Sequence, residues 1–258
     1  VIGGSAVIVT STLVYRFGTA GLWYDIGAIT GLMVLGLWLA PRIRATGAHS
    51  LPDLIGISYG KGSRIASSVM LIIVEVGWIA LLLQASGFII EEALGSRSWI
   101  ALLMAASVFT AYTALGGQMG VVRTDKVQII FVVSSLLVIM AALIFNGAEI
   151  SGSVSNFPTT DGLGVSLAVS AFLVMFLSHI VGPDIYSKVL CARGPKDAGR
   201  GAIIGAFLRL LVSIIVAACA LLGITYYGET VGGASLLPAA AIDLLPIFLS
   251  YPILIGLL

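Results

Sequence analysis

Charge is what this sequence has least of. Charged residues make up 10% of its 258 residues, against about a quarter of an ordinary soluble domain. A soluble protein of this size could not cover its surface with so few charged groups. The composition therefore excludes a soluble globular enzyme, a disordered chain and a coiled coil. The net charge of +1 gives no electrostatic basis for binding nucleic acid, and two cysteines are too few for a disulfide framework.

Motifs of catalysis and metal binding are also missing. The chain contains no HExxH, no P-loop and no GxSxG at a strand–helix junction. Its two histidines lie far apart in the sequence, whereas a transition-metal site needs several such ligands together. We therefore predict that the protein is not an enzyme and has no organic cofactor.

What the sequence does have is a hydrophobic fraction of 59% and a mean hydropathy of +1.12. The apolar residues form long runs, unlike the alternating strands of about ten residues in a membrane barrel. Because a helix needs about 20 apolar residues to cross the bilayer, we predict an all-α integral membrane protein. About seven transmembrane helices are expected, near residues 2–17, 20–41, 65–93, 98–114, 126–145, 163–182 and 201–227.

Both ends of the chain look incomplete. An eighth span begins near residue 252 and is cut off at Leu258, and residues 234–249 are expected to form a short helical connection. The chain starts at Val1 without a Met or a charged targeting region. We therefore expect it to be the middle part of a longer membrane protein.

The basic residues indicate which loops face the cytoplasm. Ten of the 13 Lys and Arg residues lie in loops 41–64, 115–126 and 183–200, whereas the opposite loops hold only Arg16 and Arg97. Short cytoplasmic loops carry an excess of Lys and Arg. We therefore predict that these three loops are cytoplasmic in a plasma or inner membrane.

Ionisable groups inside predicted spans are candidates for function. Arg209 and Glu75 lie about 8 and about 10 residues from the cytoplasmic ends of their spans, roughly 12 and 15 Å deep. We predict that they form an ion pair or line one cavity. The alternatives are that Arg209 reaches back to the surface and that Glu75 is protonated and structural.

Two further polar positions allow either a structural or a functional interpretation. His179 and Ser178 precede Gly182 and Pro183, where the proline removes a backbone donor. A helix break beside polar side chains is typical of ligand sites in transporters, although a packing histidine at a helix end gives the same pattern. Asp25 lies near the outer end of its span and faces either a cavity or outside water.

The first predicted span is rich in small and hydroxylic residues, which include Ser5, Thr10, Ser11 and Thr12. Such residues suit close helix packing. They also suit an unwound segment whose carbonyls coordinate Na⁺, and the residues alone leave both interpretations open.

The segment YTALGGQMGVVRTDKVQ at 112–128 closely resembles the signature of the sodium/solute symporter family. In that family two glycines end one helix, and a Thr-Asp pair opens the next and is followed by Gln. The matching residues here are Gly116, Gly117, Thr124, Asp125 and Gln128.

The resemblance extends over nearly the whole chain in order and spacing. Segments 3–27, 50–65 and 182–202 look like the family's first core helix, a cytoplasmic loop and the loop after the sixth core helix. The sequence departs from the family at Gln118, Gly120 and Arg123, and we expect these differences to tune the loop.

This resemblance implies a leucine-transporter-type fold of five plus five helices in inverted repeats. The first repeat would be 1–145, with its first helix truncated. Residues 146–162 would form an extracellular loop, and 163–258 an incomplete second repeat.

The resemblance also implies roles for individual residues. Ile2 matches a backbone carbonyl of the sodium site, and Asp125 matches an acid implicated in sodium release. An acid at a helix N-terminus is stabilised by the helix dipole and can attract a departing cation.

Other positions match substrate contacts of a sugar-transporting relative. These are Asp25, Arg209, Ala6, Met175 and Ser178. Because the side chains at the last three positions differ in chemistry from that relative, a sugar is not implied. With Ser5, Glu75 and His179 they make up the predicted substrate cavity.

The expected function is sodium-coupled transport of a small organic solute by alternating access, with Na⁺ as the coupling ion. Arg209 could bind a carboxylate of that solute. One alternative is a membrane sensor domain of a symporter-like histidine kinase. Another is an amino-acid permease of similar architecture, against which the spacing of the Gly-Gly, Thr-Asp and Gln residues argues.

Overall fold

The computed structural model describes residues 4–94, 99–150, 157–160, 162–228, 231–233 and 236–257. Within these ranges it describes side chains except at 4–5, 85–94, 100–101, 104–105, 112, 118–124, 251 and 255–257.

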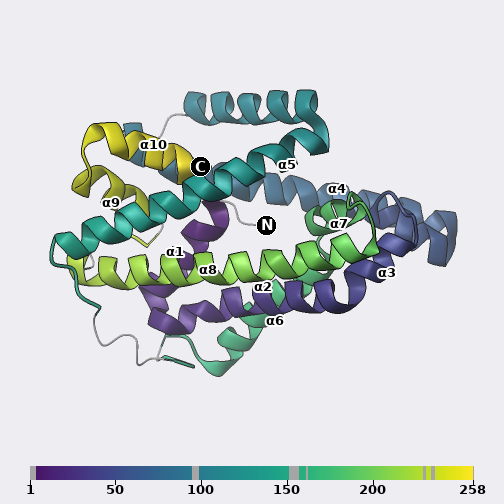
Figure 1. Ribbon diagram of the computed structural model, residues 1–258, viewed down its shortest axis with the longest axis horizontal. Coiled ribbons are helices and arrows are strands. Elements are labelled where there is room, and N and C mark those ends of the chain that lie inside the picture. Colours follow the sequence, from purple (N-terminus) through teal and green to yellow (C-terminus); the bar gives the residue numbers. More distant parts are fainter. Residues whose placement is uncertain are drawn as a thin grey trace. The chain divides into compact units, whose positions relative to one another are not determined.

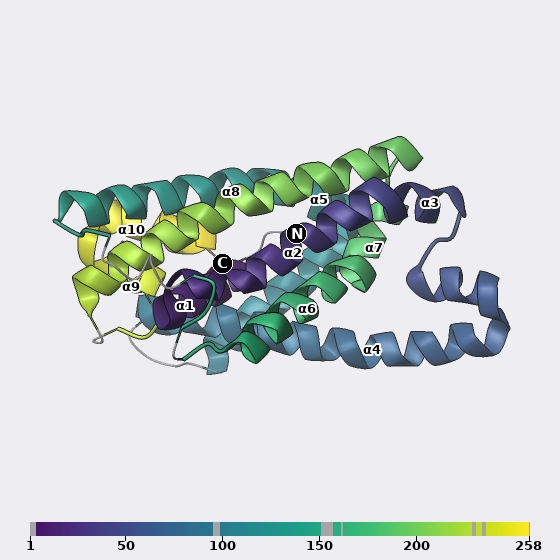
Figure 2. The ribbon, with the colours of Figure 1, turned by 90° about the horizontal axis from the view of Figure 1, so that it is seen from below.

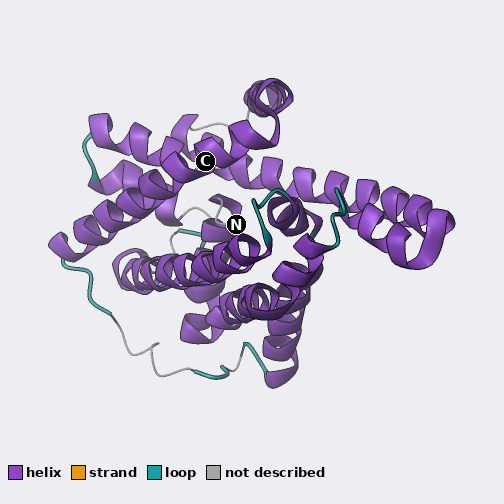
Figure 3. Ribbon diagram, turned by 45° about the vertical axis from the view of Figure 1, so that its right-hand side comes forward, coloured by secondary structure: helices purple, strands orange, loops and turns teal. Residues whose placement is uncertain are grey.

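The described chain is built from helices joined by loops (Figures 1 and 3). The helical elements are α1 (Gly4–Phe17), η1 (Gly18–Leu22), α2 (Trp23–Val34), η2 (Leu35–Leu39), α3 (Ala40–Ala45), α4 (Leu51–Leu94), α5 (Trp99–Phe145), α6 (Val165–Val181), α7 (Pro183–Leu190), α8 (Pro195–Tyr227), α9 (Leu236–Leu244) and α10 (Ile247–Leu257). The expectation of an all-α protein is confirmed for these residues.

Five helical runs of the described residues are long and apolar enough to cross a membrane: Ala6–Ala45, Leu51–Gln84, Asp125–Phe145, Val165–Leu190 and Pro195–Tyr227. Some helices begin before the predicted starts of their spans. Helix α8 begins six residues before the predicted 201, since Pro195, which suits a first helical turn, starts it within the basic loop. Helix α10 begins at Ile247 instead of near 252, and Pro252 lies inside it.

Single glycines divide the two longest helices. Gly60 interrupts α4 with φ 85° and ψ 178°, and Gly117 interrupts α5 with φ 54° and ψ −165°. Only glycine adopts such backbone conformations without strain. The predicted end of a helix at the Gly116-Gly117 pair is therefore confirmed at Gly117.

The predicted place of Asp125 at the start of the next helix was wrong. Helical backbone resumes directly after Gly117, so Asp125 lies about two turns inside the second part of α5. The Thr-Asp pair contains no helix breaker, whereas the positive φ of Gly117 breaks the helix by itself.

A wider turn connects α2 to α3. Residues Leu35–Leu39 form a π-helix, in which the Ala40 N–H donates to the Leu35 carbonyl five residues back. Pro41 follows and has no N–H to continue the regular ladder. The turn places Gly36 against α8, where an added Cβ would lie 2.9 Å from the Gly199 carbonyl oxygen.

The chain divides into two compact units that are interleaved along the sequence. The first unit consists of Leu22–Ile79 and Leu163–Leu211. Its core joins residues of α2, η2, α3, α7 and α8, which include Leu32, Leu35, Ile43, Ile185, Tyr186, Val189 and Ala206.

The second unit consists of Ile2–Gly21, Ala80–Gly162 and Val212–Leu258. Its core joins apolar faces of α1, α5, α8, α9 and α10, which include Val7, Val132, Leu136, Ile139, Leu143, Val216, Leu222, Leu237 and Leu254. The thiol of Cys219 donates to the Leu136 carbonyl across 3.5 Å inside this core.

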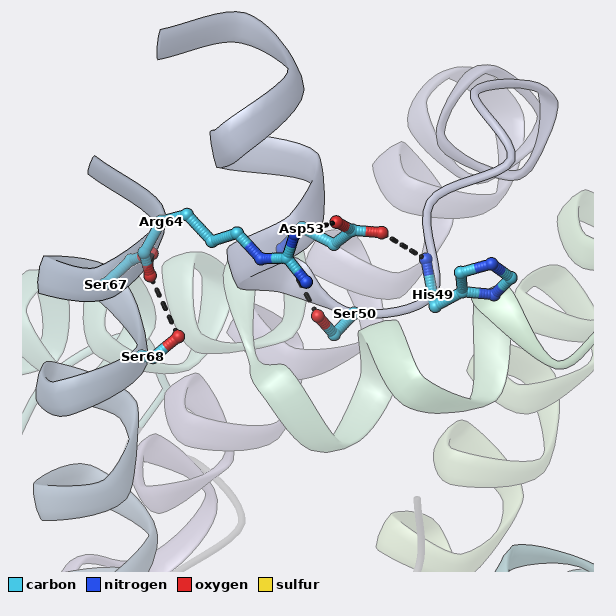
Figure 4. A network of polar contacts seen from close by, with 6 residues as sticks. All are labelled: His49, Ser50, Asp53, Arg64, Ser67 and Ser68. Atoms are coloured by element: carbon cyan, nitrogen blue, oxygen red, sulfur yellow. Dashed lines mark hydrogen bonds and ion pairs between the residues drawn. The ribbon is translucent and has the colours of Figure 1, made fainter. Parts of the chain in front are cut away.

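A polar network holds the start of α4 against the segment after Gly60 (Figure 4). Ser50 Oγ accepts the backbone N–H of Asp53 at 3.2 Å, and Asp53 Oδ2 accepts the N–H of His49 at 3.1 Å. Arg64 then pairs with Asp53 Oδ1 at 3.2 Å. The reversal at Gly60 makes this contact possible, because it returns the chain toward residue 53.

Candidate functional site

A buried ion pair lies in the first unit between α2 and α8. The Arg209 guanidinium donates to Asp25 Oδ1 from Nε at 2.8 Å and from Nη2 at 2.5 Å. Asp25 is 1% exposed and Arg209 4% exposed. Two N–H groups therefore converge on one carboxylate oxygen, away from solvent.

Each residue of the pair has a defined position on its helix. Asp25 lies in the first turn of α2, where the positive end of the helix dipole favours a carboxylate. Arg209 lies near the middle of α8, 14 residues after Pro195, or about 21 Å along the helix. A buried charge needs such a partner, and here each residue supplies it for the other.

The predicted ion pair of Arg209 with Glu75 was therefore wrong. Arg209 binds Asp25 instead, and Glu75 lies half-buried on α4 in the same unit. A similar depth along two helices does not decide which residues meet, and the depth of Arg209 was counted from residue 201 although α8 begins at Pro195. The alternative that Arg209 reaches back to the surface is also wrong, since its side chain is buried.

Glycines bring α6 directly against α2, and the two helices lie side by side in both ribbon views (Figures 1 and 2). A Cβ added at Gly31 would lie 2.6 Å from the Phe176 carbonyl oxygen and 3.0 Å from His179 Cβ. Gly27, four residues earlier, faces the Phe172 carbonyl in the same way. This Gly-x-x-x-Gly spacing allows close backbone approach.

The predicted polar residues of α6 lie along the helix that this contact positions. Met175 is buried, and Ser178 and His179 are half-buried. His179 Nδ1 lies 2.9 Å from the Met175 carbonyl oxygen, which can only accept, so this contact assigns the proton to Nδ1. In the neutral ring Nε2 is then an acceptor.

The break after His179 is confirmed. Helix α6 ends at Val181, Gly182 is extended with φ −61° and ψ 129°, and α7 begins at Pro183. An added Cβ at Gly182 would meet the Ser178 carbonyl, so this position requires glycine. The first unit thus contains Asp25, Glu75, Met175, Ser178, His179 and Arg209.

The other predicted residues belong to the second unit. Ala6 is half-buried on α1, and Asp125 is half-buried on α5. Ser5 lies on α1, but its side chain is outside the described residues, as is the whole of Ile2. Their predicted roles in sodium and substrate binding remain predictions.

The hydroxyl groups of α1 support helix packing over its described length. Thr12 Oγ1 donates to the Ile8 carbonyl at 2.7 Å, and Ser11 Oγ donates to the Gly233 carbonyl at 3.4 Å. The Tyr15 hydroxyl donates to the Gly228 carbonyl. The bonds of Ser11 and Tyr15 connect α1 to the segment that follows α8, and residues from Gly4 to Phe17 are helical without an unwound turn.

Sequence reasoning singled out Asp25 and Arg209 but not their contact. A separation of 184 residues has no local signature. The glycines at 27 and 31 were also missed, although their spacing of four within an apolar run was a readable signal. Among the described residues, no three His, Cys, Asp or Glu side chains cluster as metal ligands.

Comparison with protein families matches the chain to the sodium:solute symporter family over residues 1–258. A search of curated proteins found no match. The family's members are transporters rather than enzymes, and the family implies Na⁺ as coupling ion. With its apolar helices, the match identifies a multi-pass membrane protein.

Proposed function

Because the chain belongs to the sodium:solute symporter family, we propose that it moves a small organic solute together with Na⁺ by alternating access. Solute would bind near the middle of the membrane, between two inverted repeats formed by 1–145 and 163–258, with 146–162 as an extracellular loop. The match spans the whole chain and favours neither a sensor domain nor an amino-acid permease.

The buried pair of Asp25 and Arg209 is the observation that supports this proposal. Ionisable residues inside a membrane are costly and mark substrate or ion pathways. A pair of opposite charges with 4% or less exposure is a polar centre within the apolar parts of α2 and α8. Met175, Ser178 and His179 lie on α6 beside α2, and we assign them to the same solute site.

The chemistry of the pair favours a solute with a carboxylate. The planar guanidinium of Arg209 has five N–H donors, of which two bind one oxygen of Asp25. A solute carboxylate would bind the remaining donors or replace Asp25 as the partner. Bidentate binding of carboxylates is a property of arginine that lysine lacks.

Sodium would use groups of the second unit. We propose that the Ile2 carbonyl binds Na⁺ and that the Asp125 carboxylate attracts the ion as it leaves. Ser5 and Ala6, on helix α1 of this unit, keep their predicted roles as solute contacts. Loops 41–64, 115–126 and 183–200 would face the cytoplasm, where their Lys and Arg residues obey the positive-inside rule.

The proposal can be tested with full-length protein in liposomes. Uptake of a panel of labelled solutes would be measured with an inward Na⁺ gradient and with K⁺ in its place. We expect uptake of a carboxylate-bearing solute that depends on Na⁺. The Arg209→Gln variant should lose it, whereas Arg16→Gln, a change at an exposed arginine at the end of α1, should not.

Two results would refute parts of the proposal. Equal uptake with Na⁺ and K⁺ gradients would exclude sodium coupling. Unchanged uptake and solute affinity in Arg209→Gln would exclude a substrate role for the buried pair.

A further inference from the structure

The first unit carries a basic surface at one end. Residues of α3, the segment before α4, α7 and the start of α8 share one apolar core there, which includes Ile43, Ala48, Ile185, Val189 and Ala198. Because this core holds these elements together, their basic side chains gather at the same end. They are Arg42, Arg44, Lys188, Arg193, Lys196 and Arg200, and we call them the basic rim.

The basic rim has an excess of positive charge. Six cations share this end with two carboxylates on the same elements, Asp184 of α7 and Asp197 of α8. The nearby Asp53 is already paired with Arg64. Arg44 Nε donates to the Ala192 carbonyl at 2.7 Å, which fixes α3 to the loop after α7.

Arg42 is held in a defined position on this rim. Its Nη1 donates to the Trp38 carbonyl at 2.7 Å, and its Cζ lies 5.3 Å from the centre of the Trp38 ring. Both contacts are with the same residue, one turn earlier. Among the described residues, the other N–H groups of the Arg42 guanidinium have no acceptor.

Trp38 indicates where the membrane surface lies relative to the rim. The indole is 63% exposed, and tryptophan is enriched at headgroup level in membrane proteins. Leu37, the neighbour of Trp38 in η2, is also exposed, as are Ile204 and Phe207 of α8, one and two turns after Arg200. Exposed apolar side chains thus lie next to basic residues along both segments of the chain.

We propose that Arg42 and Trp38 form a binding site for the headgroup phosphate of an anionic phospholipid. The remaining donors of Arg42 bind the phosphate oxygens, as the planar guanidinium favours. The basic rim supplies the charge complementarity that selects a net negative headgroup. The acyl chains lie on the exposed apolar residues next to Trp38.

The π-helix contributes to this site. The turn Leu35–Leu39 directs Gly36 onto α8, and Trp38, two residues on, is left exposed. Arg42, four residues after Trp38, lies one turn further along the continuous helical backbone at the start of α3. The site therefore belongs to the connection between α2 and α3 and does not depend on solute binding or transport.

The test uses full-length protein purified in detergent and titrated with phosphatidylglycerol or phosphatidylcholine, with bound lipid counted by native mass spectrometry. We expect the wild type to retain phosphatidylglycerol preferentially. The Arg42→Gln variant should bind it about tenfold more weakly, the loss of a charge-assisted bond. Trp38→Leu should weaken it as well, and Arg42→Lys should restore binding only in part.

The matched control is Arg16→Gln, which removes an exposed arginine from α1 in the second unit and should leave lipid binding unchanged. Equal binding by the wild type, Arg42→Gln and Trp38→Leu would overturn the proposal. So would an equal loss in Arg16→Gln, which would reveal a general effect of charge. Displacement of the lipid by millimolar inorganic phosphate would show a site for free phosphate and would also overturn it.

Discussion

At the scale of single residues, the contact between Asp25 and Arg209 connects parts of the chain that are 184 residues apart. The sequence identified both residues, because an ionisable group in an apolar run stands out by itself. It did not identify them as partners, because partner choice depends on which helices pack together. The similar depths of Arg209 and Glu75 in their predicted spans suggested Glu75 as the partner of Arg209. Glu75 lies on α4, however, and the observed partner Asp25 lies on α2.

Removing the carboxylate of Asp25 should be strongly destabilising. The Asp25→Asn variant leaves the Arg209 guanidinium buried without its counter-charge, and breaking one partner of a buried pair costs about 3–5 kcal/mol. We expect a clear fall in the melting temperature of purified full-length protein. The double variant Asp25→Asn/Arg209→Gln should recover part of this loss.

The control for this change is Asp53→Asn, which weakens the partly exposed pair with Arg64 and should cost about 1 kcal/mol or less. If Asp25→Asn and Asp53→Asn melt at the same temperature, the Asp25–Arg209 pair does not stabilise the protein.

Residue-scale packing gives a second prediction at Gly31. An added methyl group would meet the Phe176 carbonyl at 2.6 Å, and backbone cannot move aside easily. Gly31→Ala should therefore destabilise the protein by about 1–3 kcal/mol, measured by thermal unfolding. The control is Gly77→Ala, in which the added methyl group meets open space. Because alanine has a higher helix propensity than glycine, this change should stabilise the protein by up to about 1 kcal/mol. Equal melting temperatures for the two variants would contradict the close contact of α2 and α6.

At the scale of helices, glycine positions explain what the sequence could and could not predict. The pair at 116 and 117 predicted a helix end, and Gly117 provides it through its positive φ. Gly60 provides the same break in α4, but several glycines spread through a polar loop did not indicate at which one the chain reverses. The start of α8 at Pro195 was missed because hydropathy marks the apolar part of a helix and not its polar first turns. The start of α10 at Ile247 has another cause, since its first turn is apolar and Pro252, near the predicted start, lies inside the helix.

Substitution of Gly60 should open the hairpin. With φ 85° and ψ 178°, an L-residue is strained by about 1–3 kcal/mol. Gly60→Ala should weaken the contact of Arg64 with Asp53 and speed tryptic cleavage after Lys61 and Arg64 in detergent-solubilised protein. Gly62→Ala, two residues on, meets no neighbour and should be cut at the wild-type rate. Equal cleavage of both variants would show that the conformation of Gly60 does not maintain the hairpin.

At the scale of the whole molecule, composition predicted the class of protein and local hydropathy predicted most helices. The two compact units were beyond prediction, since each one collects segments from both halves of the chain. A single sequence contains the charges of the loops but not which loops meet. The basic rim therefore appeared in the sequence only as scattered Lys and Arg residues.

The proposed orientation can be tested with the two native cysteines. Cys191 is exposed in the loop 183–200, and Cys219 is buried on α8. A membrane-impermeant maleimide should label Cys191 in inside-out vesicles and not in intact cells. Cys219 should stay unlabelled in both, as an internal control. Labelling of Cys191 from outside intact cells would reverse the orientation.

The buried pair also has an electrical consequence. One elementary charge that crosses a potential of 100 mV gains or loses about 2.3 kcal/mol, so a lone buried arginine would tie conformational change to voltage. Asp25 and Arg209 carry opposite charges on the same unit and move together, so the membrane field does no net work on their translation. Any current that accompanies the proposed transport would then be carried by the ion and the solute.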